Sequence, residues 1–432
     1  MVMAESAPIN PIAEEVAPER YRQTEVGVIP NDWIVRRLGD VCTIFGRIGF
    51  RGYTVADIVE EGEGPISLSP SNIQNGELTT VKCTYVSWDK WKESPEIQIQ
   101  NGDTLLVKTG STVGKTAYVK NLRGEATINP QVVVLKKRKI SDRFLGYVVA
   151  FDAIQGQLVS TTVGGALPTL SQKQVAGYAF PCPPTRKEQD AIAGALSDTD
   201  ALIASLENLM AKKRAIKQGA MQELLTGKSR LPGFKGHWKK YCLAALADIR
   251  SGGTPSTSHP EFWGGGIPWC TPTDITTLEG QKYLADTART ISAAGLSASS
   301  AEIIPPQSVI MTSRATIGEC AINTRPVTTN QGFKNLIPHD ETDVEFLYYY
   351  MSIQKDRLIT LCGGSTFLEI GKGQLSNFEV EVPITKEEQK AIATSLAAMD
   401  AEVASLAQKL GKARQIKQGM MQELLTGRVR LT

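Results

Sequence analysis

The chain has 432 residues, of which 41% are hydrophobic and 21% are charged, and its formal net charge at pH 7 is +2. This composition is typical of a globular protein with two or three domains, and no apolar run reaches the roughly eighteen residues that a membrane-spanning helix needs. The net charge is too small to indicate nucleic-acid binding by itself, so any cationic surface must be local.

The N-terminal residues and the cysteines indicate the cellular setting. Residues 1–20 combine early acidic residues with prolines and lack the basic and then apolar pattern of a signal peptide, so we expect a flexible extension. The seven cysteines are odd in number and form no CxxC pair. A reducing cytoplasm and the absence of a zinc site are therefore expected.

Residues 21–184 predict a first globular domain. Runs of β-branched residues alternate with turns rich in Gly, Pro, Ser and Asn, which is typical of a sheet-rich α/β domain. Short polar side chains stand beside cations in these turns and suit contacts to phosphates and base edges, although for any one of them a solvated turn is the simpler interpretation. The candidate contacts are Arg47, Arg51, Ser69, Asn72, Lys108, Thr109, Ser111, Thr112, Lys115, Asn129 and Gln131.

One stretch of this domain, TGSTVGKT from Thr109 to Thr116, resembles a phosphate-binding P-loop. The P-loop pattern requires glycine where Thr109 stands, and the residues that follow predict a strand instead of a helix. We therefore reject nucleotide binding and expect no cofactor.

A long helix is predicted over 185–227. Thr185 with Glu188 forms the pattern of a capping box, and Gly227 supplies a C-cap about 41 residues later, which corresponds to roughly 60 Å of helix. Apolar residues follow the steps of four and three of a coiled-coil seam, which also contains Thr199 and Lys213. The seam residues of this first helix are Ile192, Leu196, Ile203, Leu206 and Met210.

After a linker at 228–236, residues 237–383 predict a second domain. Its segments match those of the first domain in the same order: PISLSPSNI parallels IPWCTPTDI, and GDTLLVKTGSTVGKTAYV parallels PQSVIMTSRATIGECAIN. The candidate contacts in its turns are Thr254, Ser256, Thr273, Asp274, Ser313, Arg314, Thr316, Asn330, Gln331 and Lys334. Asn and Gln in these turns suit paired hydrogen bonds to adenine.

A second long helix is predicted over 384–427, followed by a tail at 428–432. Residues 187–231 align without a gap to 387–431, with 26 of 45 positions identical. The seam continues in Ile392, Leu396, Met399, Val403, Leu406 and Leu410. Acidic first halves and basic second halves favour antiparallel pairing of the two helices. Gly219 and Gly419, which lie inside both helices, indicate either a close helix contact or a kink.

The predicted fold class is thus α/β: two sheet-rich globular domains joined by two long antiparallel coiled-coil helices with internal pseudo-twofold symmetry. The three histidines lie far apart in sequence, and no nucleophile elbow, adenine-methyltransferase tetrapeptide or nuclease carboxylate–lysine cluster stands out. No catalytic residue is assigned, and a recognition protein is favoured over an enzyme.

The chain resembles the DNA-specificity subunits of type I restriction-modification systems from about residue 20 onward. The most similar stretches are RSGGTPSTSHPEFWGGGIPWCTPTDI, SRATIGECAINTRPVTTNQGF and the two EQxAI…LLTG helices, whereas Arg47 to Arg51 departs from the family pattern. The resemblance implies two target-recognition domains, each reading one half of a bipartite, asymmetric double-stranded DNA target, with the helices setting the gap.

The resemblance also implies partners. Such a subunit has no activity alone and recruits two copies of a methyltransferase, which methylates adenine N6, together with motor-nuclease restriction subunits. The helix residues Gln189, Gln218, Gln389 and Gln418 are expected to be exposed and to form the docking surface. A two-domain protein-binding scaffold without DNA specificity remains the alternative.

Overall fold

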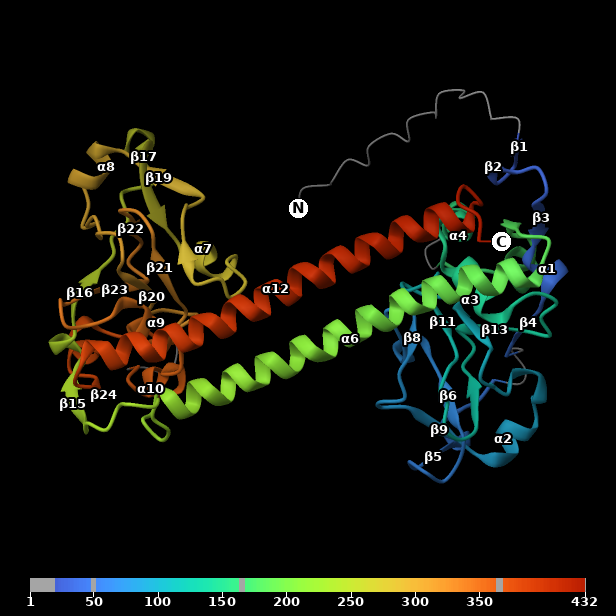
Figure 1. Ribbon diagram of the computed structural model, residues 1–432, viewed down its shortest axis with the longest axis horizontal. Helices are drawn as coiled ribbons and strands as arrows, with labels where there is room; N and C mark the ends of the chain where they lie inside the picture. Colours follow the sequence, from blue (N-terminus) through green and yellow to red (C-terminus); the bar gives the residue numbers. More distant parts are fainter. Residues whose placement is uncertain (1–19, 48–51, 163–167, 363–367, 432) are drawn as a thin grey trace. The chain divides into compact units, whose positions relative to one another are not determined.

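The computed structural model describes residues 20–47, 52–162, 168–362 and 368–431 (Figure 1). The chain divides into two compact units, one formed by Met1–Ser205 together with Leu410–Thr432 and the other by Leu206–Lys409. Each unit therefore contains one globular domain, the first half of the helix that follows it, and the second half of the other long helix. Within the described ranges, no helix has the length and apolar character needed to cross a membrane.

Two four-stranded sheets form the first domain. The antiparallel sheet has the order β11 (Thr116–Tyr118), β10 (Thr104–Val107), β13 (Val132–Lys136), β4 (Thr43–Gly46). The mixed sheet has the order β12 (Ala126–Ile128), β6 (Ile66–Leu68), β9 (Thr84–Val86), β5 (Ile58–Val59), with β12 and β6 parallel. The two-stranded pairs are β1 (Tyr21–Thr24) with β2 (Gly27–Pro30), β3 (Ile34–Arg37) with β14 (Ala179–Cys182), and β7 (Ile73–Gln74) with β8 (Glu77–Leu78).

The central strands of the antiparallel sheet are buried on both faces. Leu106 and Val133 face a core that includes Phe144, whereas Leu105 and Val134 face a second core. This explains why these strands read as continuous apolar runs, without polar alternation. The helices of this domain are α1 (Leu38–Val41), α2 (Trp88–Lys92), α3 (Asp142–Ala150), α4 (Asp152–Thr162) and α5 (Gln172–Gly177), and single 3-10 turns lie at Val55–Asp57, Pro70–Asn72 and Pro95–Ile97.

The second domain repeats the central part of this topology, with a five-stranded and a three-stranded sheet. Its larger sheet has the order β16 (Ala247–Ser251), β23 (Phe333–Pro338), β20 (Val309–Thr312), β21 (Cys320–Asn323), β18 (Tyr283–Leu284), and its smaller sheet the order β19 (Arg289–Ile291), β17 (Trp263–Cys270), β22 (Thr328–Thr329). β15 (Trp238–Cys242) pairs with β24 (Glu379–Pro383). The helices are α7 (Pro272–Thr276), α8 (Ala293–Ser297), α9 (Val344–Ser352), α10 (Lys355–Thr360) and α11 (Lys372–Ser376), with 3-10 turns at Leu243–Ala245 and Pro260–Phe262.

The parallel between the two domains that the sequence predicted is confirmed by the strand orders. β16, β23, β20 and β21 take the places of β4, β13, β10 and β11. The parallel pair of β17 and β22 corresponds to the parallel pair of β6 and β12. The chain is therefore an internal duplication at the level of topology as well as sequence.

The two long helices are α6 (Arg186–Leu224) and α12 (Lys386–Leu425). Gly227 and Gly427 have φ values of +70° and +76°, which is the left-handed conformation predicted for the C-caps. At the start of α6 the Thr185 hydroxyl accepts a hydrogen bond from the Glu188 backbone N–H at 3.3 Å. The predicted return bond from the Glu188 side chain is not found, because that carboxylate pairs with Arg430.

Within each unit the two helices pair antiparallel. In the first unit Ile192 and Leu196, near the start of α6, share a core with Leu425 at the end of α12, and in the second unit Ile392 shares a core with Leu225. Ile203, Leu206, Met210, Met399 and Val403 are half-buried, and Leu406 and Leu410 are buried. The antiparallel prediction is confirmed within both units.

The polar residues of the seam face partners on the opposite helix. In the first unit Thr199 donates to the Met420 sulfur at 3.4 Å, and in the second unit Lys213 pairs with Glu402 at 2.6 Å. No close approach occurs at Gly219 or Gly419, since a Cβ built on either glycine would meet nothing within 4 Å. The close-contact explanation of these glycines is therefore wrong.

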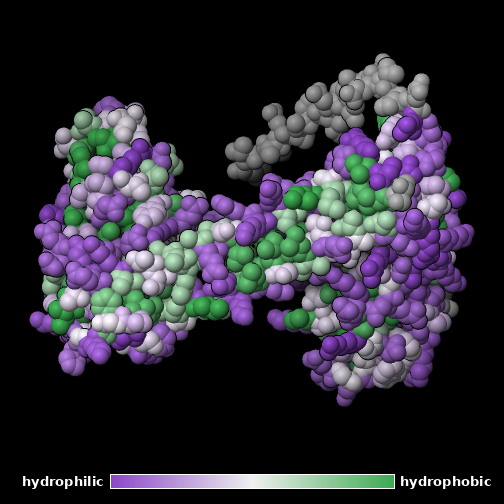
Figure 2. All heavy atoms as spheres, viewed as in Figure 1, coloured by the Kyte–Doolittle hydropathy of each residue, from purple (hydrophilic) through white to green (hydrophobic). Residues whose placement is uncertain are grey.

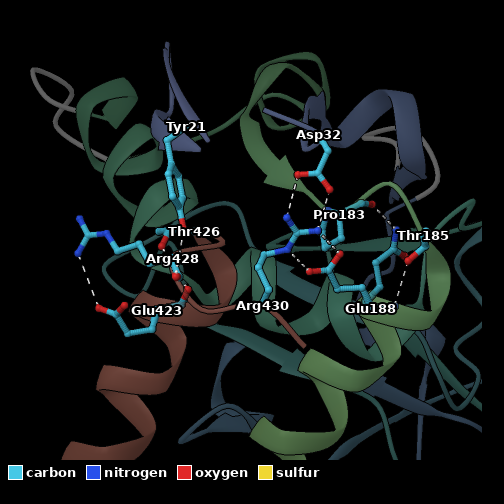
Figure 3. Close-up of polar contacts among 10 residues, drawn as sticks. Tyr21, Asp32, Pro183, Thr185, Glu188, Glu423, Thr426, Arg428 and Arg430 are labelled. Atoms are coloured by element: carbon cyan, nitrogen blue, oxygen red, sulfur yellow. Dashed lines mark hydrogen bonds and ion pairs between the residues drawn. The ribbon is translucent and has the colours of Figure 1, made fainter. Parts of the chain in front are cut away.

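The residues that follow each long helix are held by an arginine clasp. Figure 3 shows Arg430 forking onto Asp32, at 2.8 Å from both carboxylate oxygens, and reaching Glu188 at 2.5 Å. In the second unit Arg230 pairs with Glu388 at 2.6 Å. Of the segment predicted as a tail, Arg430 is therefore held against the first unit.

Candidate nucleic-acid interface

The predicted polar turns of the first domain meet at one edge of the sheets. The Lys108 N–H donates to the Gln131 carbonyl at 2.8 Å, and the Leu170 N–H donates to the Lys108 carbonyl at 2.8 Å. The Asn129 N–H donates to the Leu68 carbonyl at 2.9 Å, which adds the segment after β6. We call the assembly of 68–72, 108–115, 129–131 and 168–170 the first loop edge.

Cations and an amide project from the first loop edge. Ser111, Lys115 and Gln131 are exposed, while Lys108, Thr109 and Thr112 are half-buried. Neither Lys108 nor Lys115 forms an ion pair with a residue in the described ranges. Gln131 is oriented by the Asn129 side chain, whose Nδ2 donates to Gln131 Oε1 at 3.2 Å. This set can neutralise a phosphate and present an amide to a base edge.

Two candidates of the first domain, Asn72 and Ser69, shape a turn. Asn72 is 1% exposed, accepts from the Ser69 N–H at 3.0 Å and donates to the Thr79 carbonyl at 3.1 Å, so it shapes the turn and cannot reach a ligand. Ser69 is half-buried and its hydroxyl donates to the Asn72 amide oxygen at 2.9 Å. Arg51 lies outside the described residues.

Arg47 is also internal. Its guanidinium donates to the Ile128 carbonyl and to the Thr127 hydroxyl, both at 3.0 Å, and only 4% of the residue is exposed. Burial lowers the pKa of Arg47. Arg47 therefore ties β4 to β12 and does not belong to the exposed contact surface.

The second domain assembles the corresponding loop edge. The Ser313 N–H donates to the Gly332 carbonyl at 2.7 Å, the Ile370 N–H to the Ser313 carbonyl at 3.0 Å, and the Asn330 N–H to the Cys270 carbonyl at 3.0 Å. A Cβ on Gly252 would lie 1.8 Å from the Asn330 carbonyl oxygen, so the segment after β16 can approach only as glycine. The second loop edge comprises 252–256, 270–276, 312–319, 329–332 and 368–370.

The exposed side chains of the second loop edge differ from those of the first. Arg314 is paired with Glu369 at 2.6 Å, and the Thr254 hydroxyl donates to Gln331. The exposed hydroxyl candidates are Thr254, Ser256, Thr273 and Thr316. Asn330 is half-buried and accepts from the Gly332 N–H at 2.9 Å. Neutral donors thus predominate where the first domain presents two lysines.

Three candidates of the second domain are buried. Asp274 accepts from the Thr271 backbone and hydroxyl and from the Ala288 N–H at 2.8 Å, so its oxygens are occupied. Ser313 is fully buried, and Lys334, which is 5% exposed, donates to its hydroxyl at 3.4 Å. Burial lowers the pKa of Lys334. Sequence reasoning failed here because buried turn caps and exposed contacts use the same residue types.

The expected exposure of two of the four docking glutamines is wrong. Gln189 is 4% exposed and accepts from the Ser141 N–H at 2.9 Å, and Gln389 is 2% exposed and accepts from the Asp343 N–H at 2.9 Å. These amides join each long helix to the start of α3 or to the segment before α9. Gln218 and Gln418 are exposed, as expected.

Sequence reasoning missed the segment 286–289, which adjoins the second loop edge. The bond from the Ala288 N–H to Asp274 brings this segment to the turn at 271–276, and Arg289 follows as the first residue of β19. The pairing of β17 with β19 brings together residues about twenty positions apart, and nothing in the local pattern identifies it. No cluster of three His, Cys, Asp or Glu side chains with the arrangement of a metal site occurs in the described ranges.

Comparisons with known proteins identify the family. The model of the type I restriction modification DNA specificity domain matches twice, at residues 30–218 and 235–415, and the chain belongs to this family. The resemblance to DNA-specificity subunits of type I systems is thus confirmed at the level of the family.

Two relatives from Methanocaldococcus jannaschii differ in how much of them is matched. The chain is 39% identical to the type I restriction enzyme MjaIX specificity subunit over 38% of either chain, and 25% identical to the MjaVIII specificity subunit over 96% of either. A relative from Escherichia coli, the EcoR124I/EcoR124II specificity subunit, is 26% identical over 51% of this chain and 54% of its own. The chain thus spans under two fifths of the first of these relatives and nearly all of the second.

Solved structures share the fold. One, from work on complex assembly and conformational transition of the type I R-M system, has a TM-score of 0.58 at 20% identity and covers 93% of this chain and 99% of its own. The type I restriction-modification S subunit from M. genitalium has a TM-score of 0.54 at 15% identity and covers 91% and 96%. The predicted α/β fold with two sheet-rich domains is confirmed.

Proposed function

We propose that the chain is the sequence-specific DNA-recognition subunit of a type I restriction-modification complex. Each domain reads one half of a bipartite, asymmetric target in double-stranded DNA, and the long helices set the gap between the halves. The observation that carries the proposal is the loop edge: two domains of equal topology present different side chains from the same set of turns. Conserved topology with altered contacts is what two unlike half-sites require.

The two loop edges support different kinds of readout. Lys108 and Lys115 place positive charge on the first edge, where contacts to phosphates gain affinity that depends on salt. The second edge offers the hydroxyls of Thr273 and Thr316, which can donate to and accept from base edges, and that of Thr254, which donates to Gln331 and can still accept.

The long helices are the proposed docking surface for two copies of a methyltransferase subunit, which modifies adenine N6, and for the restriction subunits. Gln218 and Gln418 occupy equivalent exposed positions. Figure 2 shows hydrophobic surface over the long helices, and the exposed apolar residues of α6 include Leu202 at 53%, Leu209 at 41% and Ile216 at 47%. Exposed apolar groups beside polar ones are typical of a protein interface.

Mapping methylated adenines across the genome of a host with the complete system tests the proposal. We expect one bipartite motif that disappears when the gene for this chain is deleted. Exchange of residues 237–383 for the same segment of another family member should then change one half of the motif and leave the other half intact. A change in both halves of the motif, or in neither, would contradict the proposal that each domain reads one half of the target.

A protein-binding scaffold is the competing function, and salt dependence separates the two. Phosphate contacts impose a steep loss of affinity with rising salt. If the purified chain with its methyltransferase shows negligible affinity for duplex DNA containing the mapped motif at low salt, the scaffold explanation replaces the present one.

A further inference from the structure

Beside the second loop edge, the side chain of Arg289 is stacked against Trp263 and Trp269. Trp269 of β17 lies opposite Arg289 of β19 in the antiparallel register, at the end of β19 that adjoins the turn at 271–276. The guanidinium carbon of Arg289 lies 3.9 Å from the ring centroid of Trp263 and 5.0 Å from that of Trp269. The cation is therefore stacked against aromatic surface beside the candidate contacts.

Both indole rings are anchored to the loop edge. Nε1 of Trp263 donates to the Ser256 carbonyl at 3.2 Å, and Nε1 of Trp269 donates to the Gly253 carbonyl at 2.9 Å. The two rings meet edge to face with their centroids 4.9 Å apart. This anchoring fixes the position of Arg289 relative to the segment that carries Thr254.

The N–H groups of the Arg289 guanidinium are not used within the described part of the chain. The residue is exposed, and its guanidinium forms no ion pair or hydrogen bond with another described residue. Stacking holds a guanidinium by its face and leaves the N–H groups in its plane free to fork onto two oxygens of one anion. Arg357 provides a contrast, because it stacks on Phe378 but donates to Gln354 and to the Glu379 carbonyl.

We propose that Arg289, positioned by Trp263, binds a backbone phosphate of the DNA that the second domain contacts and so orients this loop edge on the duplex. The inference rests on the proposed function. A phosphate suits the site because its oxygens match the guanidinium fork and because the cation stands beside the turns that carry the hydroxyls.

The matched strand positions in the described part of the first domain do not carry this contact. The strand registers place Ser67 and Thr84 where the second domain has Trp269 and Arg289, since Ser67 pairs with Thr127 as Trp269 pairs with Thr328. Among the described residues, the stacked arginine of the first domain, Arg47 on Tyr53, is buried, whereas Arg289 is exposed. Arg289 gives the second domain a phosphate contact where its other edge cation, Arg314, is engaged by Glu369.

The test measures binding of the full chain, in complex with its methyltransferase subunit, to a duplex carrying the mapped motif over a range of salt concentrations. We expect Arg289→Ala to weaken binding about tenfold at moderate salt and to make the slope of log K against log salt shallower by about 1. The loss should be the same for the mapped motif and for a duplex with a scrambled second half-site. Arg357→Ala removes a stacked, exposed arginine of equal charge and should leave the slope unchanged.

A double-mutant cycle tests the role of Trp263. Trp263→Leu should weaken binding in the unaltered chain and have no further effect when Arg289 is already alanine, because the ring acts through the cation. An unchanged salt slope in Arg289→Ala, or a loss confined to one base pair, would overturn the phosphate assignment. Failure of the unaltered complex to prefer the mapped motif would instead overturn the proposed function, and that result needs no variant.

Discussion

The hydroxyl of Tyr147 donates a hydrogen bond of 2.7 Å to the Asp200 carboxylate, joining α3 of the first domain to α6. Asp200 in turn pairs with Lys417 of α12 at 2.7 Å. The second unit repeats the arrangement, with Tyr349 donating to Asp400 at 2.5 Å. In each unit, one carboxylate connects a globular domain to both long helices.

Removing the tyrosine hydroxyl should loosen this junction. Tyr147→Phe and Tyr349→Phe should each lower the free energy of unfolding by about 1–2 kcal/mol, because the hydroxyl donates to a half-buried carboxylate. Urea denaturation of the full chain measures the change. Tyr85→Phe, whose hydroxyl bonds the exposed Glu61, is the matched control and should change stability by less than about 0.5 kcal/mol. Equal effects of the control and the test variants would contradict this role.

The clasp residue Arg430 should matter far more than its neighbour Arg428. Arg430→Ala leaves the Glu188 side chain, which is 4% exposed, without its ion-pair partner. The free energy of unfolding should fall by about 2 kcal/mol, a figure that allows for the partial exposure of Arg430. Arg428 is exposed and lies 3.7 Å from Glu423, so Arg428→Ala should have almost no effect. Thermal unfolding of both variants measures the contrast. A melting temperature unaltered by Arg430→Ala would show that the clasp is dispensable.

The clasp also predicts that the stability of the chain depends on pH in acid. The hydrogen bond from Arg430 holds the pKa of Asp32 below its ordinary value of 3.8. A depressed pKa means that the stabilisation is fully present above the ordinary value and is lost as the pH falls through the folded value. The stability difference between the unaltered chain and Asp32→Asn should therefore be constant at neutral pH and shrink below about pH 4. Unfolding curves recorded at successive pH values test this, and a difference that widened in acid would refute it.

Replacement of the two helix glycines should raise the free energy of unfolding. Gly219→Ala and Gly419→Ala should each stabilise the isolated chain by about 1 kcal/mol, because alanine is the better helix former and its Cβ meets nothing within 4 Å. Gly252→Ala is the contrasting variant and should destabilise the second domain, since its Cβ would overlap the Asn330 carbonyl. Denaturation measures stability. If Gly219→Ala stabilises the chain but impairs assembly with the methyltransferase, a partner lies against that position.

The helices were predictable because their signals are local. The seam of Ile392 and Leu396, the caps at Gly227 and Gly427 and the division of charge along each helix can all be read within one segment. The same reasoning misjudged Asn72, Asp274 and Lys334, whose burial depends on strands from elsewhere in the chain. Arg289 could not be predicted as a site residue for a related reason: the pairing of β17 with β19 brings its tryptophan neighbours to it.

Because the first unit includes the end of the chain, it can finish folding only after the ribosome has made the second unit. The second unit is one uninterrupted segment, Leu206–Lys409, whereas the first needs Leu410–Thr432 to be complete. The first domain therefore emerges early but waits for some two hundred further residues, about 10–40 s of translation, before Arg430 can reach Glu188 and Tyr21 can bond the Arg428 carbonyl. A chain that ends prematurely near residue 409 would contain every residue of the second unit. The first unit, although made earlier, would lack the segment 410–432.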